Sequence, residues 1–535
     1  MKPIEQIEPA FRPQLIFTHP NCRFPAKINI TEQVLDRQIR QGRAKKIAVL
    51  YAERKITYGE IYDWVNRFGN ALLGIGVEKG DPVILRIANR PEFIVAALAL
   101  HKIGAVPIPT MMLIKERNLV KIANASRARL MIVDADLLSE VEKAKASCEA
   151  LKELIVIGGS PVSRYHSYED LLARNSGVLE PVPVDRDDLG ILFFTGGTTG
   201  EPKGCMHQAS GPLAVVHVSE CIYPGGINES DVFGGTPPLP FTYGYHHAML
   251  IPFYFGAAVS LLEGRATPEK AMEAVAGHGV TLFHSVPSMY RMILNIRDAE
   301  RAATRTLRAC YSASAPIPLS TIQEWKRRFG QEIINVIGSH ELLGSFIATW
   351  REPVKPGALG YPYPGYECAI LDEHGRECAA MEPGRLALRG PTGVMYWHQP
   401  DEQKRSVVHG WSLTGDAAYR DGEGCLWHVS RTDDIIKSRG YRISPEEVEN
   451  ALAEHEAVFE CGVVGVPDEV QGEKVKAFVV LRAGFQASEK LAEELKEFSR
   501  ARIAPYAAPS LIAFIDSLPR TDLLKLSRIA LRQMA

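Results

Sequence analysis

A segment rich in glycine and hydroxyl side chains carries the sharpest chemical signal in the sequence. Residues 190–204 read GILFFTGGTTGEPKG, an apolar strand followed by a loop that ends in Lys203. Glycines let backbone N–H groups approach phosphate oxygens, threonine hydroxyls add donors, and a lysine supplies positive charge. The GxxxxGK[ST] spacing of a Walker A loop cannot be fitted here. The segment predicts another kind of anion-binding loop, although such a composition also occurs in purely structural turns.

The elements that must position this loop alternate between helical and strand patterns. Thr57-Tyr58-Gly59-Glu60 is typical of a capping box that opens a helix. The apolar face of that helix is expected to carry Ile61, Trp64, Val65, Phe68 and Leu72. The following DPVILRIAN has the composition of a strand. The alternation predicts an α/β fold with parallel strands and crossover helices.

The pattern changes between about Gly384 and Asp434, where short strand-like pieces such as GRLALRG are broken by turn residues. We place a domain boundary at Thr432–Asp433, which gives an N-terminal domain over 1–432 with a β-rich subdomain and a C-terminal domain over 433–535. The smaller domain begins with Ser444-Pro445-Glu446-Glu447, an N-cap followed by proline and an acidic first turn. Strands and helices alternate after it, which predicts a small α+β unit.

Composition and charge exclude several classes of function. The 535 residues include 61 Lys and Arg against 63 Asp and Glu, so the balance does not favour nucleic acid or an anionic membrane as partner. The start MKPIEQIEPAFRPQL lacks the pattern of a signal peptide, and no apolar run approaches the ~18 residues of a spanning helix. The nine cysteines form no CxxC pair. We expect a soluble cytoplasmic protein that acts on small molecules.

The loop at 195–204 resembles the TSG[ST]TGxPKG segment of the adenylate-forming superfamily, which includes acyl-CoA synthetases, luciferases and peptide-synthetase adenylation domains. Further segments resemble the superfamily in the same order, from about Thr57 to Arg528. IGSHE at 337–341 resembles its YGxTE segment, TGD at 414–416 its TGD segment, and SRTDDIIK at 430–437 its GRxDDxIK segment. PRTDLLKLSR at 519–528 resembles its PRTxxGKxxR segment. Taken alone, each charged residue in these segments could be an ordinary surface group.

The resemblance implies ATP, Mg²⁺ and coenzyme A as cofactors and a C-terminal domain that moves about a hinge at Asp433. It implies catalytic roles for Lys525, His340 and Lys203, and a magnesium ligand in Glu341, whose carboxylate is a hard oxygen donor. The implied CoA-binding residues are Ser438 and Gly440. The implied ATP- and AMP-binding residues are Thr195, Gly196, Gly197, Thr198, Thr199, Gly200, Lys203, Ser312, Ala313, Ile337, Gly338, His340, Glu341, Asp416, Arg431 and Arg442.

Four residues depart from the superfamily pattern. Gly196 replaces a serine of the loop, Leu524 replaces the glycine before Lys525, and Ala507 stands where a lysine is frequent. His340 replaces a threonine that contacts the adenylate phosphate; a histidine can also donate to phosphate, but it titrates near neutral pH. These changes keep a nucleotide-binding pseudoenzyme open as an alternative to an active ligase.

Within the superfamily the sequence resembles benzoate- and 2-aminobenzoate-CoA ligases. LPFTYGY at 239–245, LFHSVPS at 282–288 and VIGSHELL at 336–343 are similar to segments that wall the acid pocket in that group. Phe241, Tyr243, Gly244 and His284 are the implied pocket residues, and plain core packing is the alternative for the two aromatic ones. The expected activity is ATP-dependent ligation of an aromatic acid to CoA. A short or branched aliphatic acid, a carrier protein as acceptor, and a homodimer are left open.

Overall fold

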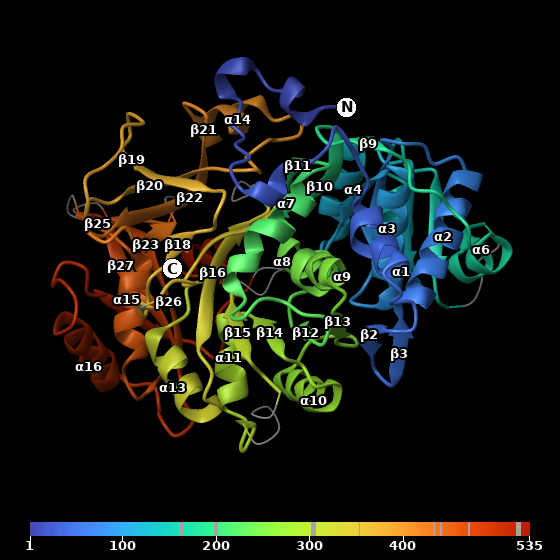
Figure 1. Cartoon of the computed structure of the whole chain (residues 1–535). Coiled ribbons are helices and arrows are strands. Elements are labelled where there is room, and N and C mark those ends of the chain that lie inside the picture. Colours follow the sequence, from blue (N-terminus) through green and yellow to red (C-terminus); the bar gives the residue numbers. More distant parts are fainter. Residues whose placement is uncertain are drawn as a thin grey trace.

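The computed structural model describes residues 1–159, 164–196, 202–300, 306–352, 354–431, 434–438, 441–468, 471–520 and 526–535, and for Gly196 and Arg442 it describes the backbone alone. Figure 1 shows the chain running from the blue N-terminal elements on the right to the orange and red C-terminal elements on the left. Four larger sheets and one hairpin organise it.

The first sheet is wholly parallel and confirms the expected βα alternation. Its strands, in spatial order, are β5 (Val106–Pro109), β4 (Pro82–Arg86), β6 (Leu130–Asp134), β7 (Glu153–Ile157) and β8 (His166–Ser167). Helices α3 (Pro91–Ile103), α4 (Glu116–Ser126) and α5 (Leu138–Lys145) connect its strands, while α2 (Tyr58–Gly74) precedes β4 and α6 (Tyr168–Arg174) follows β8. Helix α2 begins at the predicted capping box, because Thr57 accepts from the Glu60 amide and the Glu60 carboxylate accepts from the Thr57 amide.

The second sheet has nine strands, and its central six run parallel. In spatial order these strands are β18 (Tyr361–Pro362), β17 (Gly344–Ala348), β16 (Ile333–Ser339), β15 (Ala309–Ser312), β14 (Leu282–Ser285), β12 (Val232–Gly235), β13 (Ala258–Leu261), β2 (Ile47–Tyr51) and β3 (Arg54–Thr57). The helices along this stretch are α7 (Gly211–Val218), α8 (Thr242–Tyr245), η7 (His246–Leu250), α9 (Ile251–Phe255), α10 (Pro268–His278), α11 (Pro287–Leu294) and α13 (Leu319–Phe329). A hairpin of β10 (Leu189–Gly196) and β11 (Pro202–Gln208) connects the two parallel sheets.

The third sheet is the β-rich region expected from the short strand signals. Its strands are β19 (Glu367–Leu371), β20 (Gly384–Arg389), β22 (Trp411–Arg420), β21 (Val407–Val408) and β23 (Leu426–Arg431), and helix α14 (Pro400–Ser406) lies between β20 and β21 in the chain. All of their pairings are antiparallel. Antiparallel pairs need only tight turns, which explains the dense turn residues in this part of the sequence.

The fourth sheet belongs to the C-terminal part, by which we mean residues 434–535. It contains β25 (Tyr441–Ile443), β24 (Ile436–Ser438), β27 (Gly472–Leu481), β26 (Val458–Asp468) and β28 (Leu511–Phe514), with helices α15 (Pro445–Ala453), α16 (Glu489–Arg500) and α17 (Arg528–Gln533). Ser444 caps α15 by accepting from the Glu447 amide, as the sequence predicts. This part has an apolar core cluster of its own, centred on Val448, Val463 and Val479.

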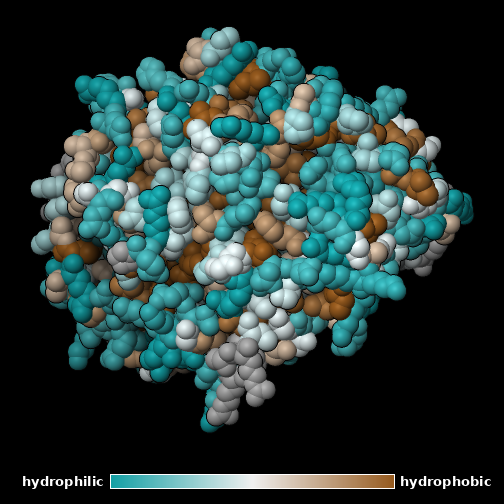
Figure 2. All heavy atoms as spheres, in the orientation of Figure 1, coloured by the Kyte–Doolittle hydropathy of each residue, from teal (hydrophilic) through white to brown (hydrophobic). Residues whose placement is uncertain are grey.

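The surface agrees with the composition. Figure 2 shows one face on which hydrophilic residues predominate and apolar residues are scattered. Within the described ranges, no helix combines the length and the apolar character needed to cross a membrane.

Candidate functional site

Both ends of the glycine-rich loop are held next to each other by a strand pair. Thr195 on β10 lies opposite Lys203 on β11, and Gly196 lies opposite Pro202. The predicted phosphate-binding residues Gly197, Thr198, Thr199 and Gly200 fall outside the described residues. The antiparallel register therefore makes the loop the tip of a hairpin, with Lys203 at its base.

Lys203 makes an ion pair with a carboxylate of helix α14. Its Nζ lies 2.7 Å from Glu402 Oε2, and both side chains are mostly buried. Arg405 also contacts Glu402. Burial opposes the charged form of Glu402, but these two cations outweigh it and lower the pKa of the carboxyl. The lysine is thus held in place by an internal anion.

The carboxyl ends of the parallel strands of the second sheet form the floor of the site. Ser312 ends β15 with its Oγ buried and without a hydrogen-bond partner among the described residues, and the Ala313 amide donates to the Ser285 carbonyl at 3.2 Å. Ser314 follows with a left-handed φ of 76°, a conformation that costs energy for a residue other than glycine. Ligands of α/β proteins bind at this edge of the sheet, which agrees with the predicted roles of Ser312 and Ala313.

Strand β16 delivers the residues of the IGSHE segment to the same edge. Ile337 and Gly338 pair with β17, and a bulge lies between them. A Cβ atom at Gly338 would lie 2.4 Å from the Gly344 carbonyl oxygen, so only glycine fits there. The bulge and the close approach bend the strand end, which places His340 and Glu341 just beyond it.

The imidazole of His340 contacts the predicted acid pocket directly. Its ring lies edge-on to Phe241, with 4.4 Å between ring centroids, and packs against Phe193 from another side at 5.5 Å. His207 Nε2 donates to the His340 carbonyl at 2.8 Å. Burial lowers the pKa of His207 to about 3, so this histidine stays neutral and fixes the His340 backbone. The nucleotide motif and the pocket motif therefore meet at one side chain.

The remaining pocket residues form a buried group of polar aromatic rings. Tyr243 Oη and His284 Nδ1 share a hydrogen bond of 3.2 Å, and His284 stacks on Tyr311 at 4.3 Å. Burial lowers the pKa of His284 to about 3, so its imidazole is neutral. Gly244 has no room for a side chain, because a Cβ would lie 2.1 Å from the Pro238 carbonyl oxygen. This arrangement suits a flat ring with a polar edge.

Glu341 points back towards the hairpin. Burial is the main cause that raises the pKa of Cys205 and of Tyr396, and the negative charge of Glu341 raises both further. The Glu341 carboxylate therefore lies near β11. In the described part of the chain, no three His, Cys, Asp or Glu side chains gather in a group able to hold a metal ion. A metal on Glu341 would therefore take its other ligands from substrate oxygens and water.

Asp416, in the middle of β22, and Arg431, the last residue of β23, form a cross-strand pair. They lie opposite each other, and Arg431 Nη1 is 3.2 Å from Asp416 Oδ1. Burial opposes ionisation of Asp416, but Arg431 and His428 outweigh it and set its pKa at about 2. The pair is consistent with the ribose-binding roles implied by the sequence, because a fixed carboxylate accepts from hydroxyl groups.

Several predicted residues lie where the structure gives only part of their surroundings. Ser438 is buried at the end of β24 and lies opposite Tyr441. Arg442 lies in β25, and for this residue only the backbone is described. Gly440, the hinge residue Asp433 and the catalytic candidate Lys525 fall outside the described residues, as does Leu524. Arg520, upstream of Lys525, contacts Glu460 of β26.

The sequence did not point to His428, which the structure places beside Asp416. Its Nε2 lies 3.5 Å from Asp416 Oδ1, and its Nδ1 lies 2.5 Å from Glu446 Oε2. Residues three apart on a regular strand face opposite sides, so His428 and Arg431 should be separated. An extra residue, Val429, interrupts the pairing of β22 with β23 and returns both side chains to one face. A bulge of this kind leaves no composition signal.

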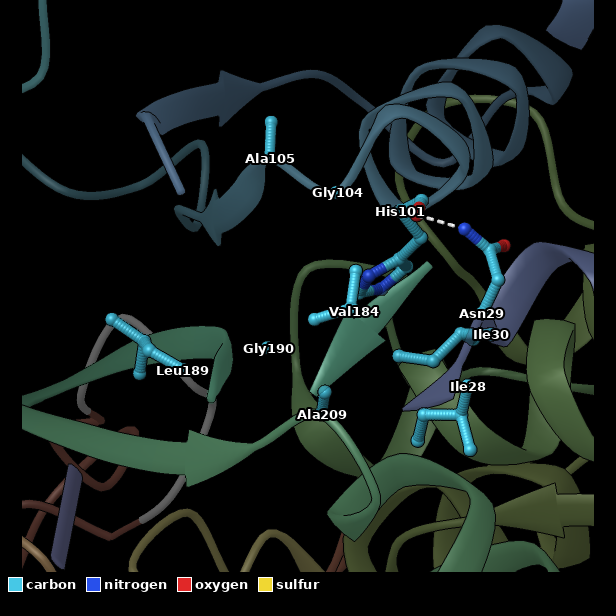
Figure 3. A pocket seen from close by; sticks show the side chains of 10 residues that line it. All are labelled: Ile28, Asn29, Ile30, His101, Gly104, Ala105, Val184, Leu189, Gly190 and Ala209. Atoms are coloured by element: carbon cyan, nitrogen blue, oxygen red, sulfur yellow. Dashed lines mark hydrogen bonds between the residues drawn. The ribbon is translucent and has the colours of Figure 1, made fainter. Parts of the chain in front are cut away.

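A separate small cavity lies at the far end of β10 from Thr195. It is lined by Ile28, Asn29, Ile30, His101, Gly104, Ala105, Val184, Leu189, Gly190 and Ala209. Figure 3 shows Asn29 donating to the His101 carbonyl at its rim, a bond of 3.0 Å. The lining is mainly apolar, and Asn29 also donates to the carbonyls of Lys102 and Val182. Those bonds tie the N-terminal segment to α3, which is a structural role.

Comparisons with known proteins agree with this geometry. Residues 35–397 match the AMP-binding enzyme family, and residues 447–525 match the AMP-binding enzyme C-terminal domain. The chain is 34% identical to the benzoate–CoA ligase of Thauera aromatica over 96% of this chain and 98% of that protein. It resembles the crystal structure of the anthranilate CoA ligase AuaEII in complex with anthranoyl-AMP, with a TM-score of 0.91, 31% identity and coverage of 96% and 99%.

A benzoate CoA ligase from Burkholderia xenovorans LB400 has a similar structure, with a TM-score of 0.86, 31% identity and coverage of 94% of this chain and 100% of that one. The match to the AMP-binding enzyme family spans the hairpin loop and the IGSHE strand end, and the Asp416–Arg431 pair lies between the two family matches. Motif order, site geometry and similarity along nearly the whole length agree, and the chain belongs to the AMP-binding enzyme family.

Proposed function

We propose that this chain is an ATP-dependent ligase that joins an aromatic carboxylic acid to coenzyme A through an acyl-adenylate. The contact between His340 and Phe241 carries the proposal. Its 4.4 Å separation brings the nucleotide motif and the acid-pocket motif together at one point. An enzyme that joins a carboxylate to the α-phosphate of ATP needs these two subsites in direct contact.

The first half-reaction is an in-line displacement at the α-phosphorus. A carboxylate oxygen of the acid attacks, the bond to the β-phosphate oxygen breaks, and pyrophosphate leaves. The hairpin loop and Lys203 bind the phosphates, Asp416 and Arg431 orient the ribose, and Ser312 and Ala313 lie beside the adenine. Lys525 supplies positive charge between carboxylate and phosphate, where charge develops in the transition state.

The second half-reaction replaces AMP with the thiol of coenzyme A. The sulfur attacks the acyl carbonyl, AMP leaves, and the thiol proton passes to solvent. CoA enters beside Ser438 and Gly440 after the C-terminal part has turned about Asp433. Such a turn lets one site present different groups to two different reactions.

Magnesium fits this site as a cofactor that screens the phosphate charge. Glu341 is the residue that would hold it, since its carboxylate faces the base of the hairpin loop.

The acid is proposed to be benzoate or a ring-substituted relative such as 2-aminobenzoate. Phe241 gives an apolar wall, while Tyr243 and His284 give a polar, uncharged edge. A neutral edge of this kind accepts an amino or hydroxyl substituent and makes no ion pair with a second carboxylate. The similarity to the benzoate CoA ligases of Thauera aromatica and Burkholderia xenovorans supports the same choice of acid.

The test is a panel of acids assayed for CoA- and ATP-dependent formation of AMP, with benzoate, 2-aminobenzoate, the hydroxybenzoates, acetate and isobutyrate. We expect the aromatic acids to have kcat/KM values at least tenfold above the aliphatic ones. The reason is that the apolar contacts of a ring stabilise the transition state by roughly 1–3 kcal/mol more than those of a small aliphatic group. Faster turnover of acetate than of every aromatic acid would refute the assignment.

Two controls separate the alternatives. Pyrophosphate release that occurs with acid and ATP excludes a pseudoenzyme, and its absence with every acid would support one. Formation of an acyl-CoA thioester by the purified chain distinguishes a CoA ligase from an enzyme that loads a carrier protein. Magnesium dependence is checked by titrating Mg²⁺ into protein treated with a chelator.

A further inference from the structure

His428 lies between the nucleotide-binding strands and the C-terminal part. It stands on β23 before the predicted hinge, while its partner Glu446 stands on α15 after it. The Nδ1–Oε2 distance is 2.5 Å, and both side chains are mostly buried, with 11% and 16% exposed. Its other nitrogen, Nε2, lies 3.5 Å from Asp416. One imidazole thus touches a carboxylate on each side of the hinge.

The charged groups around His428 come from each neighbouring element. Strands β22 and β23 contribute Asp416 and Arg431. Helix α15 contributes Glu446 and also Glu449, but Glu449 is paired with Arg528 of α17, and Arg528 pairs with Asp434 as well. Among the residues that the structure describes, the carboxylates in contact with the imidazole are Asp416 and Glu446.

We propose that His428 is a positioning residue with two contacts. It holds the carboxylate of Asp416 for the ribose, and it fastens helix α15 to strands β22 and β23. Nucleotide binding and the placement of the C-terminal part are thereby coupled. The inference deepens the proposed function and rests on it for the roles of Asp416 and the hinge.

The protonation state makes the double contact work. A neutral imidazole donates from one nitrogen only, whereas the imidazolium ion donates from both. Burial disfavours the ion, but the two carboxylates outweigh burial and raise the pKa of His428 to about 10. A raised pKa means that the stabilisation is complete below the ordinary value of ~6.5 and is lost as pH rises through about 10. Around neutrality His428 is a fixed cation.

The contact also opposes the turn required for the second half-reaction. If the C-terminal part rotates about Asp433, α15 moves away and the Nδ1–Oε2 bond to Glu446 breaks. Asp416 then keeps Arg431 and the other nitrogen of His428. Because AMP leaves only in the second half-reaction, the turn has to break the bond to Glu446 while the acyl-adenylate still occupies Asp416.

The experiment compares His428→Gln, Glu446→Gln and the double variant with the parent protein. Glutamine can still donate and accept hydrogen bonds, but it removes the positive charge of His428 in one variant and the negative charge of Glu446 in the other. For His428→Gln we expect the KM for ATP in pyrophosphate release to rise about tenfold, because a charge-assisted hydrogen bond to Asp416 is lost. The KM for the acid should stay within about twofold, since the pocket residues are untouched.

A second readout needs no catalysis. Arg431 and Lys437 are exposed on either side of the hinge, so trypsin cleavage after them reports how firmly the C-terminal part is docked. Both single variants should be cleaved about fivefold faster, and the double variant no faster than His428→Gln, because residues of one network are not additive. AMP should slow cleavage of the parent protein more than that of either single variant, because each substitution breaks the link between Asp416 and α15.

His455→Gln is the matched control. This buried histidine also pairs with a carboxylate, at 3.4 Å from Glu494, but both residues lie within the C-terminal part. Unchanged ATP KM and unchanged cleavage in His428→Gln, or additive effects in the double variant, would overturn the proposal. If His428→Gln does not fold, Glu446→Gln alone decides by its cleavage rate. A parent protein without pyrophosphate release refutes the proposed function, while cleavage and AMP binding still test the coupling.

Discussion

His340 joins the two halves of the site at the scale of a single side chain. It replaces the usual threonine, and its ring is fixed by Phe241 and Phe193 while His207 holds its backbone. We propose that it donates a hydrogen bond to the adenylate phosphate or to the acid's carboxylate.

His340→Ala should then slow adenylation by about tenfold, since one donor to a charged group is lost. His340→Thr should keep activity, because a threonine hydroxyl can also donate to the phosphate. The measurement is pyrophosphate release against pH for the three proteins. A His340→Ala protein with the parent rate and profile excludes the donor role, and a faster one points to a degraded enzyme.

Phe241 carries the choice of acid. It is only partly buried and packs on His340, so its exposed face is available to a substrate. Phe241→Ala should reduce kcat/KM for aromatic acids more than for aliphatic ones, by roughly 1–3 kcal/mol of discrimination. The acid panel provides the measurement. Phe253→Ala, a buried ring that packs on Tyr58 away from the site, is the control for general loss of packing.

Equal losses with every acid in Phe241→Ala would mark it as a core residue instead.

At the scale of elements, the helix caps allow a test of how strongly local sequence determines where a helix begins. Thr57→Ala removes the acceptor for the Glu60 amide at the start of α2, which costs about 1 kcal/mol. Hydrogen exchange in the first turn of α2 should become roughly fivefold faster, because local opening becomes easier by that free energy. Ser488→Ala at the cap of α16 is the matched control and should affect α16 alone. Unaltered exchange at α2 would show that packing, and not the cap, holds the first turn.

The elements also show where sequence reasoning succeeds and where it ends. The start of α2, strand β4 and the order of α15, β26, β27, α16 and β28 follow from caps, periodicity and turn residues, and the structure agrees. These signals are local. His428 was missed because its place depends on the bulge at Val429, and the pairing of Lys203 with Glu402 joins residues 199 positions apart. Contacts of that kind are set by tertiary packing.

At the scale of the whole molecule, ion pairs among the described residues join the C-terminal part to the rest of the chain at two places. His428 contacts Glu446 on one side, and Arg291 of α11 lies 3.6 Å from Glu460 of β26 on the other. Charged contacts of this kind are compatible with the proposed movement of the C-terminal part. The predicted boundary at 432–433 lies between strands β23 and β24, and it stays a prediction.

Lys525→Ala tests whether the C-terminal part takes part in the first half-reaction. It should reduce adenylation by a hundred- to a thousandfold, or ~3–4 kcal/mol, because a preorganised charge is removed from the transition state. Thioester formation from a supplied acyl-adenylate should remain near the parent rate, since the lysine belongs to the first arrangement only. Single-turnover assays of the two steps make the measurement. An unchanged adenylation rate would refute the role of Lys525 and of the C-terminal part in the first step.

The ion pair between Lys203 and Glu402 bears on how the enzyme tolerates other solutes. If Lys203 binds the phosphates as proposed, its pairing with Glu402 should make a single orthophosphate or sulfate a weak competitor, whereas a nucleoside triphosphate brings enough charge to displace Glu402. We therefore expect that only a ligand with several negative charges displaces the Glu402 carboxylate from Lys203. In a cell rich in inorganic phosphate, such an exchange keeps the site ready for its nucleotide.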